Sequence, residues 1–301
     1  MAGVAKEIWI DQIMEPFYAE ASFFDFAQDM SAYVENDTIN LADAGVDPNV
    51  LINNDTYPIT TVQRVDNPIA IPLDTFDTEN TVVRNVEAME AAYDKMESVL
   101  RGHRRALRIQ SLRRGAHAYA PQQDGQYTPV LECTGPAFTR KVGAADYTRK
   151  RMTRADLSGM KTKMTLLEGG GQFVCVLHPY HLEDLRFEDS NFDKNYIDYQ
   201  GGKLMSKLEG FIIIEYPGTP TYNSANNQKK AYGAAAALAT DCHSSFCFMQ
   251  DEVMKADGSV DMFTKLKDPD QRGDVVGFQK RFKALPIRYK FIGAWLSKPA
   301  A

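Results

Sequence analysis

An apolar stripe at alternating steps of three and four residues predicts one long α-helix, from about Val86 to Gln110. The stripe consists of Val86, Met89, Tyr93, Met96, Leu100, His103 and Leu107. This spacing places all seven on one face of the helix, and no proline interrupts it. Twenty-five residues at about 1.5 Å each give a rod about 37 Å long. We therefore expect a strut whose apolar face needs an equally long partner.

The alternating residues before this helix predict two extended arms, Thr56–Val65 and Asn67–Phe76, joined by a turn at Asp66–Asn67. An isolated two-stranded ribbon is only marginally stable in water. The three prolines in these arms suit the edge of a sheet and not its centre. We therefore expect the hairpin from Thr56 to Phe76 to contact a neighbouring copy of the chain more than its own body.

The remaining segments alternate between loops, short helices and buried strands. Residues 1–50 are acidic and aromatic, which indicates an arm that docks on another surface, and residues 111–150 are predicted to form a loop. A capping box at Thr153–Asp156 opens a helix with an apolar face, and Pro179 opens another. Alanine-rich residues 231–239 predict a packed helix. The expected strands are 172–177, 211–214, 246–250, 260–266, 273–284 and 287–296.

The strut is expected to pack against the last two of these strands, because they offer the only long apolar partner. The expected contacts on these strands are Phe278, Phe282, Ile287, Phe291 and Trp295.

The composition suits a chain with a sizeable core. Of 301 residues, 44% are hydrophobic and 25% are charged, and no apolar run reaches the length of a membrane-spanning helix. The N-terminus lacks the basic start and apolar segment of a signal peptide. The four cysteines do not form a disulfide framework, so we expect reduced thiols.

Charge is distributed unevenly along the chain. Residues 1–50 contain ten acidic residues and one base, whereas residues 101–154 contain twelve basic and three acidic residues. We expect these regions to meet, within a subunit or between subunits. The overall net charge of −6 argues against a dedicated nucleic-acid-binding protein, although the basic region is where such contacts would be sought.

Motifs for chemistry are weak. Gly169–Gly171 is not followed by the Gly-Lys-Ser/Thr of a phosphate-binding loop, and it is better explained as a helix terminator. His178 with His181, and Cys242 with His243 and Cys247, do not match the usual zinc-ligand spacings. No nucleophile elbow marks a Ser-His-Asp set. We therefore predict no catalytic residue, cofactor or metal, and a protein that is not an enzyme.

Several stretches together resemble major capsid proteins of tailed phages, with the Hong Kong 97-type fold. IAIPLDTFDTENTVV (69–83) followed by YDKMESVLRGHRRAL (93–107) resembles the junction between extended loop and spine helix in capsid proteins of phages of Bacteroidetes hosts. TRADLSGMKTKM (153–164), FVCVLHPYHLEDL (173–185) and LEGFIIIEY (208–216) resemble the axial domain. GDVVGFQKRFKALPIRYKFIGAW (273–295) resembles the closing peripheral strands.

The resemblance implies an α+β fold with five parts. These are an N-terminal arm (1–50), an extended loop (51–84), a peripheral domain with the spine helix (85–150), an axial domain (151–254) and closing strands of the peripheral domain (255–301). It also implies that copies assemble into pentamers and hexamers of an icosahedral shell around double-stranded DNA. We predict an assembly interface at Tyr57, Ile59, Arg64, Asp66, Asn67, Ile69, Ile71, Arg104, Arg105 and Arg108.

The implied partners are other copies of the chain, a portal protein and packaged DNA, with decoration proteins left open and no membrane. The short N-terminal arm leaves no room for a fused scaffolding domain, so a separate scaffolding protein is expected. The extended loop contains no lysine, which does not support lysine–asparagine cross-linking through it. The implied location is the virion, after assembly in the host cytoplasm.

Two other interpretations stay open at this point. An encapsulin-type nanocompartment shares the fold and differs in its cargo, and an α/β enzyme is a further alternative because fold does not exclude chemistry. Particle size separates them: a shell protein forms megadalton particles, whereas an enzyme runs as a small oligomer.

Overall fold

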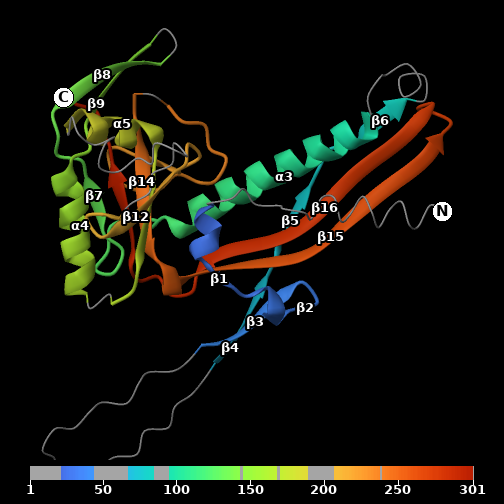
Figure 1. The fold of residues 1–301 in the computed structure, drawn as a ribbon, viewed down its shortest axis with the longest axis horizontal. Helices are drawn as coiled ribbons and strands as arrows, with labels where there is room; N and C mark the ends of the chain where they lie inside the picture. Colours follow the sequence, from blue (N-terminus) through green and yellow to red (C-terminus); the bar gives the residue numbers. More distant parts are fainter. Residues whose placement is uncertain are drawn as a thin grey trace, which may run out of the picture.

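A computed structural model describes residues 22–43, 67–84, 95–142, 145–167, 170–188, 207–237 and 239–300. Two sheets dominate these residues, and one long helix, α3 (Lys95–Tyr119), extends from the second sheet along the first (Figure 1). None of the described helices is long and apolar enough to cross a membrane.

The first sheet is long and is built mainly from two strands. β15 (Val253–Asp268) and β16 (Gly273–Pro286) pair antiparallel, and β1 (Gln28–Asp29) adds to β15 in parallel. β5 (Asp74–Asp77) and β6 (Thr81–Arg84) both pair with β16. Helix α3 lies alongside this sheet (Figure 1).

The apolar stripe of α3 packs on the first sheet as expected at Leu100 and Leu107. Leu100 and Leu107 are 3% exposed and form one cluster with Met262, Val276 and Phe278. The predicted contact with Phe278 is therefore confirmed. Phe282 contributes to the next cluster, which contains Ala116 and Tyr119 of α3. Val86, Met89 and Tyr93 lie outside the described residues.

The predicted C-terminal end of the helix at Gln110 is wrong, because α3 continues to Tyr119. Ser111, Ala116 and Tyr119 are fully buried and extend the packed face toward the second sheet. Lys229 supports the end of the helix: its Nζ donates to the carbonyls of His117 (2.7 Å) and Ala120. The prediction of a loop over residues 111–150 therefore fails for most of its length.

The second sheet has seven strands. Its order is β11 (Lys207–Leu208), β12 (Phe211–Glu215), β10 (Phe173–Leu177), β14 (Asp241–Met249), β17 (Ile292–Leu296) and β7 (Val130–Glu132), with β13 (Thr221–Asn223) beside β14. All five residues of β10 are buried, as the apolar run predicted. Helix α4 (Arg154–Leu166) packs on this sheet so closely that a Cβ on Gly293 would lie 2.8 Å from the Met160 sulfur.

Strand β17 lies in the second sheet, where it pairs with β14. Phe291 and Trp295 pack in the core of the second sheet, and the Trp295 ring lies edge-on to Phe211. Ile287 packs instead against the cluster of Ile39, Met254 and Ala256. The predicted contacts of Ile287, Phe291 and Trp295 with the strut are therefore wrong. Strand β7 pairs with β17 and also belongs to the second sheet.

Local signals placed the smaller helices well. The capping box is present, because Thr153 Oγ1 accepts from the Asp156 N–H and Asp156 Oδ2 accepts from the Thr153 N–H. Helix α5 (Pro179–Glu188) begins at Pro179 as predicted. The predicted helix at 231–239 is wrong: the described residues 231–237, 239 and 240 are exposed turns and coil, and Gly233 has a φ of +79°. Alanine favours a helix, but this segment has no buried face to stabilise one.

The N-terminal region contains structure that the sequence did not indicate. A 3₁₀ turn, η1 (Phe23–Phe26), buries Phe23 and Phe24 in the cluster between α3 and the second sheet. A second 3₁₀ turn, η2 (Ser31–Tyr33), precedes β2 (Val34–Glu35).

Two smaller elements lie elsewhere in the chain. A 3₁₀ turn, η3 (Gln250–Glu252), joins β14 to β15. A separate hairpin, β8 (Ala137–Val142) with β9 (Ala145–Lys150), lies beside α5 (Figure 1).

Candidate assembly surfaces

The predicted hairpin has a different pairing from the one expected. β4 (Asn67–Pro72) pairs with β3 (Thr38–Asp43), with Asn67 opposite Asp43 and Ile71 opposite Ile39. The expected turn at Asp66–Asn67 is therefore wrong, since Asn67 lies within a strand. The last residues of the second arm, Asp74–Phe76, belong to β5 in the first sheet. We call the β3–β4 pair the extended ribbon.

The base of the extended ribbon is anchored on its own subunit. Ile39 is fully buried and clusters with Met254 and Ala256, while Ile71 packs against the same cluster. Asp37, in the turn before β3, forms an ion pair with Arg281 of β16. From this base the ribbon leaves the body, and its strands extend away from both sheets (Figure 1). The predicted interface residues Tyr57, Ile59, Arg64 and Asp66 lie outside the described residues.

The predicted interface arginines lie on α3, far along the chain from the extended ribbon. Arg101, Arg104, Arg105 and Arg108 together line a shallow hollow on the surface. Arg101 pairs with Glu97 at 2.6 Å, with both side chains well exposed. Within the described part of the chain, Arg104, Arg105 and Arg108 have no carboxylate partner. We call these four residues the arginine row.

The expected meeting of acidic arm and basic region does not occur among the ion pairs of the described residues. Arg114 pairs with Asp74 (3.1 Å) and Arg154 with Glu209 (2.7 Å), and neither acid lies in residues 1–50. Asp37 pairs outside the basic region. The acidic residues within 1–21 and 44–50 lie outside the described ranges, so for them the expectation stays a prediction.

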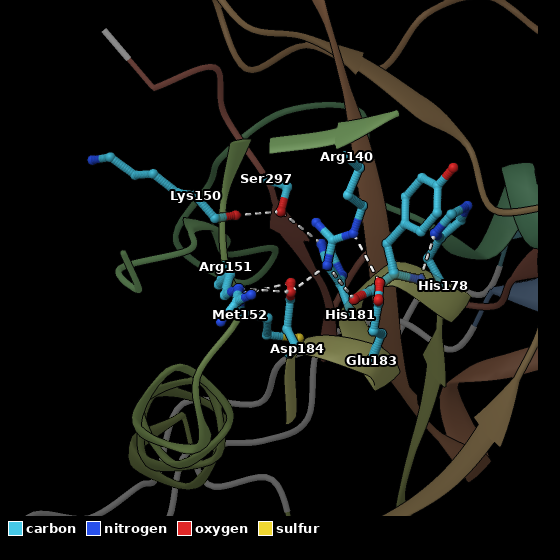
Figure 2. Close-up of polar contacts among 10 residues, drawn as sticks. Arg140, Lys150, Arg151, Met152, His178, His181, Glu183, Asp184 and Ser297 are labelled. Carbon is cyan, nitrogen blue, oxygen red and sulfur yellow. Dashed lines mark hydrogen bonds and ion pairs between the residues drawn. The ribbon is translucent and has the colours of Figure 1, made fainter. Parts of the chain in front are cut away.

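A buried polar network fastens the β8–β9 hairpin to helix α5 (Figure 2). Arg140 of β8 donates to Glu183 (2.8 Å) and to Asp184, both on α5. Asp184 is completely buried and also accepts from the Met152 N–H at 3.1 Å. The network was missed in the sequence because Arg140 and Asp184 stand 44 residues apart in no recognisable motif.

His181 occupies the centre of a second chain of hydrogen bonds in the same region (Figure 2). Ser297 Oγ donates to the Lys150 carbonyl (2.7 Å), so the 3.0 Å contact with Ser297 takes a proton from His181 Nε2. His181 Nδ1 then accepts from Ser245 Oγ at 2.6 Å, and that oxygen accepts the His178 N–H. The neutral imidazole satisfies every partner. Burial keeps the pKa of His181 well below its usual value.

Two more histidines stack beside this chain. The rings of His178 and His243 lie 4.6 Å apart with an interplanar angle of 21°. Burial, reinforced by His243 and Arg140, lowers the pKa of His178 to about 3. Burial, reinforced by Arg149 and Arg140, lowers the pKa of His243 to about 4. The Tyr180 N–H donates to His178 Nδ1 at 3.2 Å, which also requires an unprotonated nitrogen.

Acid is therefore expected to destabilise the folded chain through these histidines. Below pH 6.5 these two histidines bind protons in the unfolded state, whereas folded His178 and His243 stay neutral because their pKa values are lowered. The free energy of unfolding therefore decreases as the pH falls from 6.5 toward 4. The slope is at most about 1.4 kcal/mol per pH unit for each histidine. Urea unfolding at pH 5.0, 5.8 and 6.5 measures it. His243→Phe, which keeps an aromatic ring, should flatten this dependence, and an unchanged slope in that variant would contradict the assignment.

The sites that the sequence raised for metal binding involve the cysteines and other metal-binding residue types. Over the residues that the structure describes, no three His, Cys, Asp or Glu side chains form a group suited to a metal ion. All four cysteines are buried and unpaired, and burial raises the pKa of Cys175 and Cys247. The network and the histidines hold the hairpin and the sheet together.

The fold has clear relatives among solved structures. The chain matches neither a known protein-family model nor a curated protein sequence. The cyanophage P-SCSP1u capsid superimposes with a TM-score of 0.62 at 13% identity, over 94% of this chain and 90% of that one. The capsid of Ralstonia phage GP4 gives 0.62 at 10% identity, over 96% and 91%. A virus-like particle from Pyrococcus furiosus gives 0.55 at 9% identity, over 97% and 99%.

These likenesses confirm the predicted fold class. The chain has the α+β Hong Kong 97-type fold of phage capsid structures along nearly its whole length. The extended ribbon and the long helix with its paired strands are the elements that the resemblance implied.

Proposed function

We propose that this chain is a major capsid protein, a structural and non-catalytic subunit whose copies form the pentamers and hexamers of an icosahedral shell around double-stranded DNA. The observation that carries the proposal is the match in fold to phage capsids over more than nine-tenths of the chain. The extended ribbon adds support, because a ribbon that leaves its own body needs another surface to cover it.

The extended ribbon is the proposed assembly interface. Its base is fixed by Ile39 and Ile71, which sets the direction in which the ribbon leaves the body. Tyr57, Ile59, Arg64 and Asp66 are proposed to contact a neighbouring subunit, together with Asn67 and Ile69. The arms of such a ribbon reach about 3.3 Å per residue, so the 23 residues between β3 and β4 are enough to cross onto a neighbour.

Shortening the ribbon tests the function and the interface together. Asp43 and Asn67 are cross-strand partners, so replacing residues 44–66 with Asn-Gly closes the ribbon as a two-residue hairpin. We expect the purified wild type to form megadalton shells by sedimentation and negative-stain microscopy. The shortened chain is expected to keep its circular dichroism spectrum and melting temperature and to remain as unassembled subunits.

The control changes an exposed aromatic away from the ribbon, Tyr289→Ser, which should assemble normally. A wild type that runs as a small oligomer under all assembly conditions would contradict the proposed function. Normal shells from the shortened chain would contradict only the proposed interface.

A nanocompartment of the encapsulin type is the second candidate, and the likeness to the pyrococcal particle is the observation that favours it. Its TM-score is lower than those of the phage capsids, so the phage shell is preferred. Particles from the native source that contain double-stranded DNA support the phage shell, whereas particles filled with protein support the nanocompartment.

The finer proposals concern partners and setting. A separate scaffolding protein and a portal protein are proposed to act during assembly in the host cytoplasm, and the finished protein is proposed to reside in the virion. The stretches at 69–83 and 93–107 further suggest a phage of a Bacteroidetes host.

A further inference from the structure

We propose that the arginine row of α3 binds the phosphate backbone of nucleic acid. The inference rests on the proposed function, since a shell subunit meets DNA when the shell is filled. It goes further by assigning the contact to four residues on one element.

The helix presents these arginines on one flank, where Arg101 and Arg105 are exposed and Arg104 and Arg108 are half-buried. Arg101, Arg104, Arg105 and Arg108 are spaced at three and four residues, which brings them together on the helix surface. The face that packs on β16 is the one that carries Leu100 and Leu107. The arginine row lies about a quarter turn from that face, given about 100° per residue. A separate hollow, lined by Gly102 and Ala106, flanks the helix on the other side.

The arginine row is electrostatically unfavourable for a helix on its own. Like charges separated by three or four residues destabilise a helix by about 0.2–0.5 kcal/mol per pair, whereas alternating acids and bases stabilise it. The arginine row contains four such like-charged pairs, and Glu97 pairs with only one of its members. An external anion that bridges the arginines would remove this repulsion. The repulsion therefore favours an arginine row that binds an anion over one that only faces solvent.

Other arginines of the same helix and region have structural partners, which makes the contrast clear. Arg114 pairs with Asp74 and lies 5.1 Å from the centre of the Tyr232 ring. Arg140 is buried against Asp184. In the arginine row, only Arg101 has such a partner among the described residues. Arg104, Arg105 and Arg108 are therefore available to a partner that is not part of the subunit.

A phosphate backbone fits this surface better than an acidic segment of a second copy. The guanidinium group binds phosphate through two parallel hydrogen bonds, and the arginine row contains no lysine. It spans about 10 Å along the helix, which suits a linear polyanion. Two acids of the N-terminal region are already engaged, because Asp29 accepts from Ser31 (2.9 Å) and Asp37 pairs with Arg281.

A salt titration with duplex DNA tests the inference. Full-length unassembled protein is titrated into a labelled duplex of about 30 base pairs, and anisotropy gives the binding constant between 50 and 300 mM salt. The test variant is Arg104→Gln, Arg105→Gln and Arg108→Gln combined. The control variant removes the same charge at exposed sites elsewhere, with Lys267→Gln, Arg272→Gln and Arg288→Gln.

We expect the test variant to bind at least about tenfold more weakly at 50 mM salt. Its slope of log binding constant against log salt should be shallower by about 2–3, since each lost phosphate contact removes about 0.9. The control variant should keep the wild-type slope. Equal slopes in the wild type and the test variant, or no DNA binding by the wild type at 50 mM salt, would overturn the inference.

Assembly of the same proteins is followed separately by sedimentation. A test variant that forms shells while losing DNA binding supports the inference. A test variant that cannot form shells but binds DNA as the wild type does would assign the arginine row to a subunit interface and overturn it. A wild type that binds DNA through the arginine row yet never forms shells would instead contradict the proposed function.

Discussion

Replacing Arg140 with methionine is expected to lower the free energy of unfolding by about 3–5 kcal/mol, because it removes the ion-pair partner of the buried Asp184. This is the largest effect that we predict for a single substitution. Asp184 is completely buried, and burial raises its pKa even though Arg140 and the Met152 N–H oppose this shift. Without the Arg140 guanidinium its charge would remain in the interior with less compensation. Urea unfolding at pH 7 measures the loss of stability.

A neighbouring pair on the same hairpin provides the matched control. Lys141 and Asp146 form an ion pair at 2.8 Å with side chains 77% and 60% exposed. Because exposed pairs contribute about 0–1 kcal/mol, Lys141→Met should change the unfolding free energy by no more than that. The double change Arg140→Met with Asp184→Leu should recover much of the loss, since it removes both charges. Equal effects of Arg140→Met and Lys141→Met would show that burial of the Asp184 charge does not matter.

Replacing Leu100 with alanine is expected to lower the free energy of unfolding by about 2–5 kcal/mol. Leu100 is 3% exposed in the cluster of Leu107, Met262 and Phe278, so truncation leaves a cavity between α3 and the first sheet. The helix depends on this seam, because packing supplies most of the stability of helices in proteins. Insoluble or unassembled subunits are the expected result in cells.

Two substitutions show whether the cost arises from lost packing. Leu100→Met conserves volume and should cost less than about 1.5 kcal/mol. Leu166→Ala removes a leucine that is 78% exposed at the end of α4 and should change stability little. If Leu100→Ala has the melting temperature of the wild type and assembles normally, the apolar stripe does not hold the helix on β16.

Elements that depend on nearby residues could be predicted from the sequence. The capping box at Thr153 and Asp156 is formed by groups three residues apart, and it opens α4 as expected. The buried run Phe173–Leu177 formed a strand, and the stripe of α3 turned Leu100 and Leu107 inward. In each case the side chains that decide the conformation lie within one or two turns of the chain. The Hong Kong 97-type fold was predicted from resemblance, and the solved capsid structures confirm it.

Errors arose where a distant partner outweighed the local signal. Asp66–Asn67 has the composition of a turn, but Asn67 pairs with Asp43 because β3 supplies the hydrogen-bond partners that β4 needs. The alanine-rich segment after residue 230 has helix propensity but no surface to pack on. The helix α3 passed its predicted end because Ala116 and Tyr119 gain buried contacts with Phe24 and the second sheet.

The sequence by itself therefore determined the local helices and buried strands, the long strut and the cluster of arginines along it. Only the tertiary structure decided which strand pairs with β4, which sheet contains β17, and that Arg140 contacts Asp184. These contacts join residues between 24 and 52 positions apart, and their energies come from burial and hydrogen bonds that exist only once the sheets have formed. A periodic pattern indicates which face of an element is apolar, but it does not indicate which surface will cover that face.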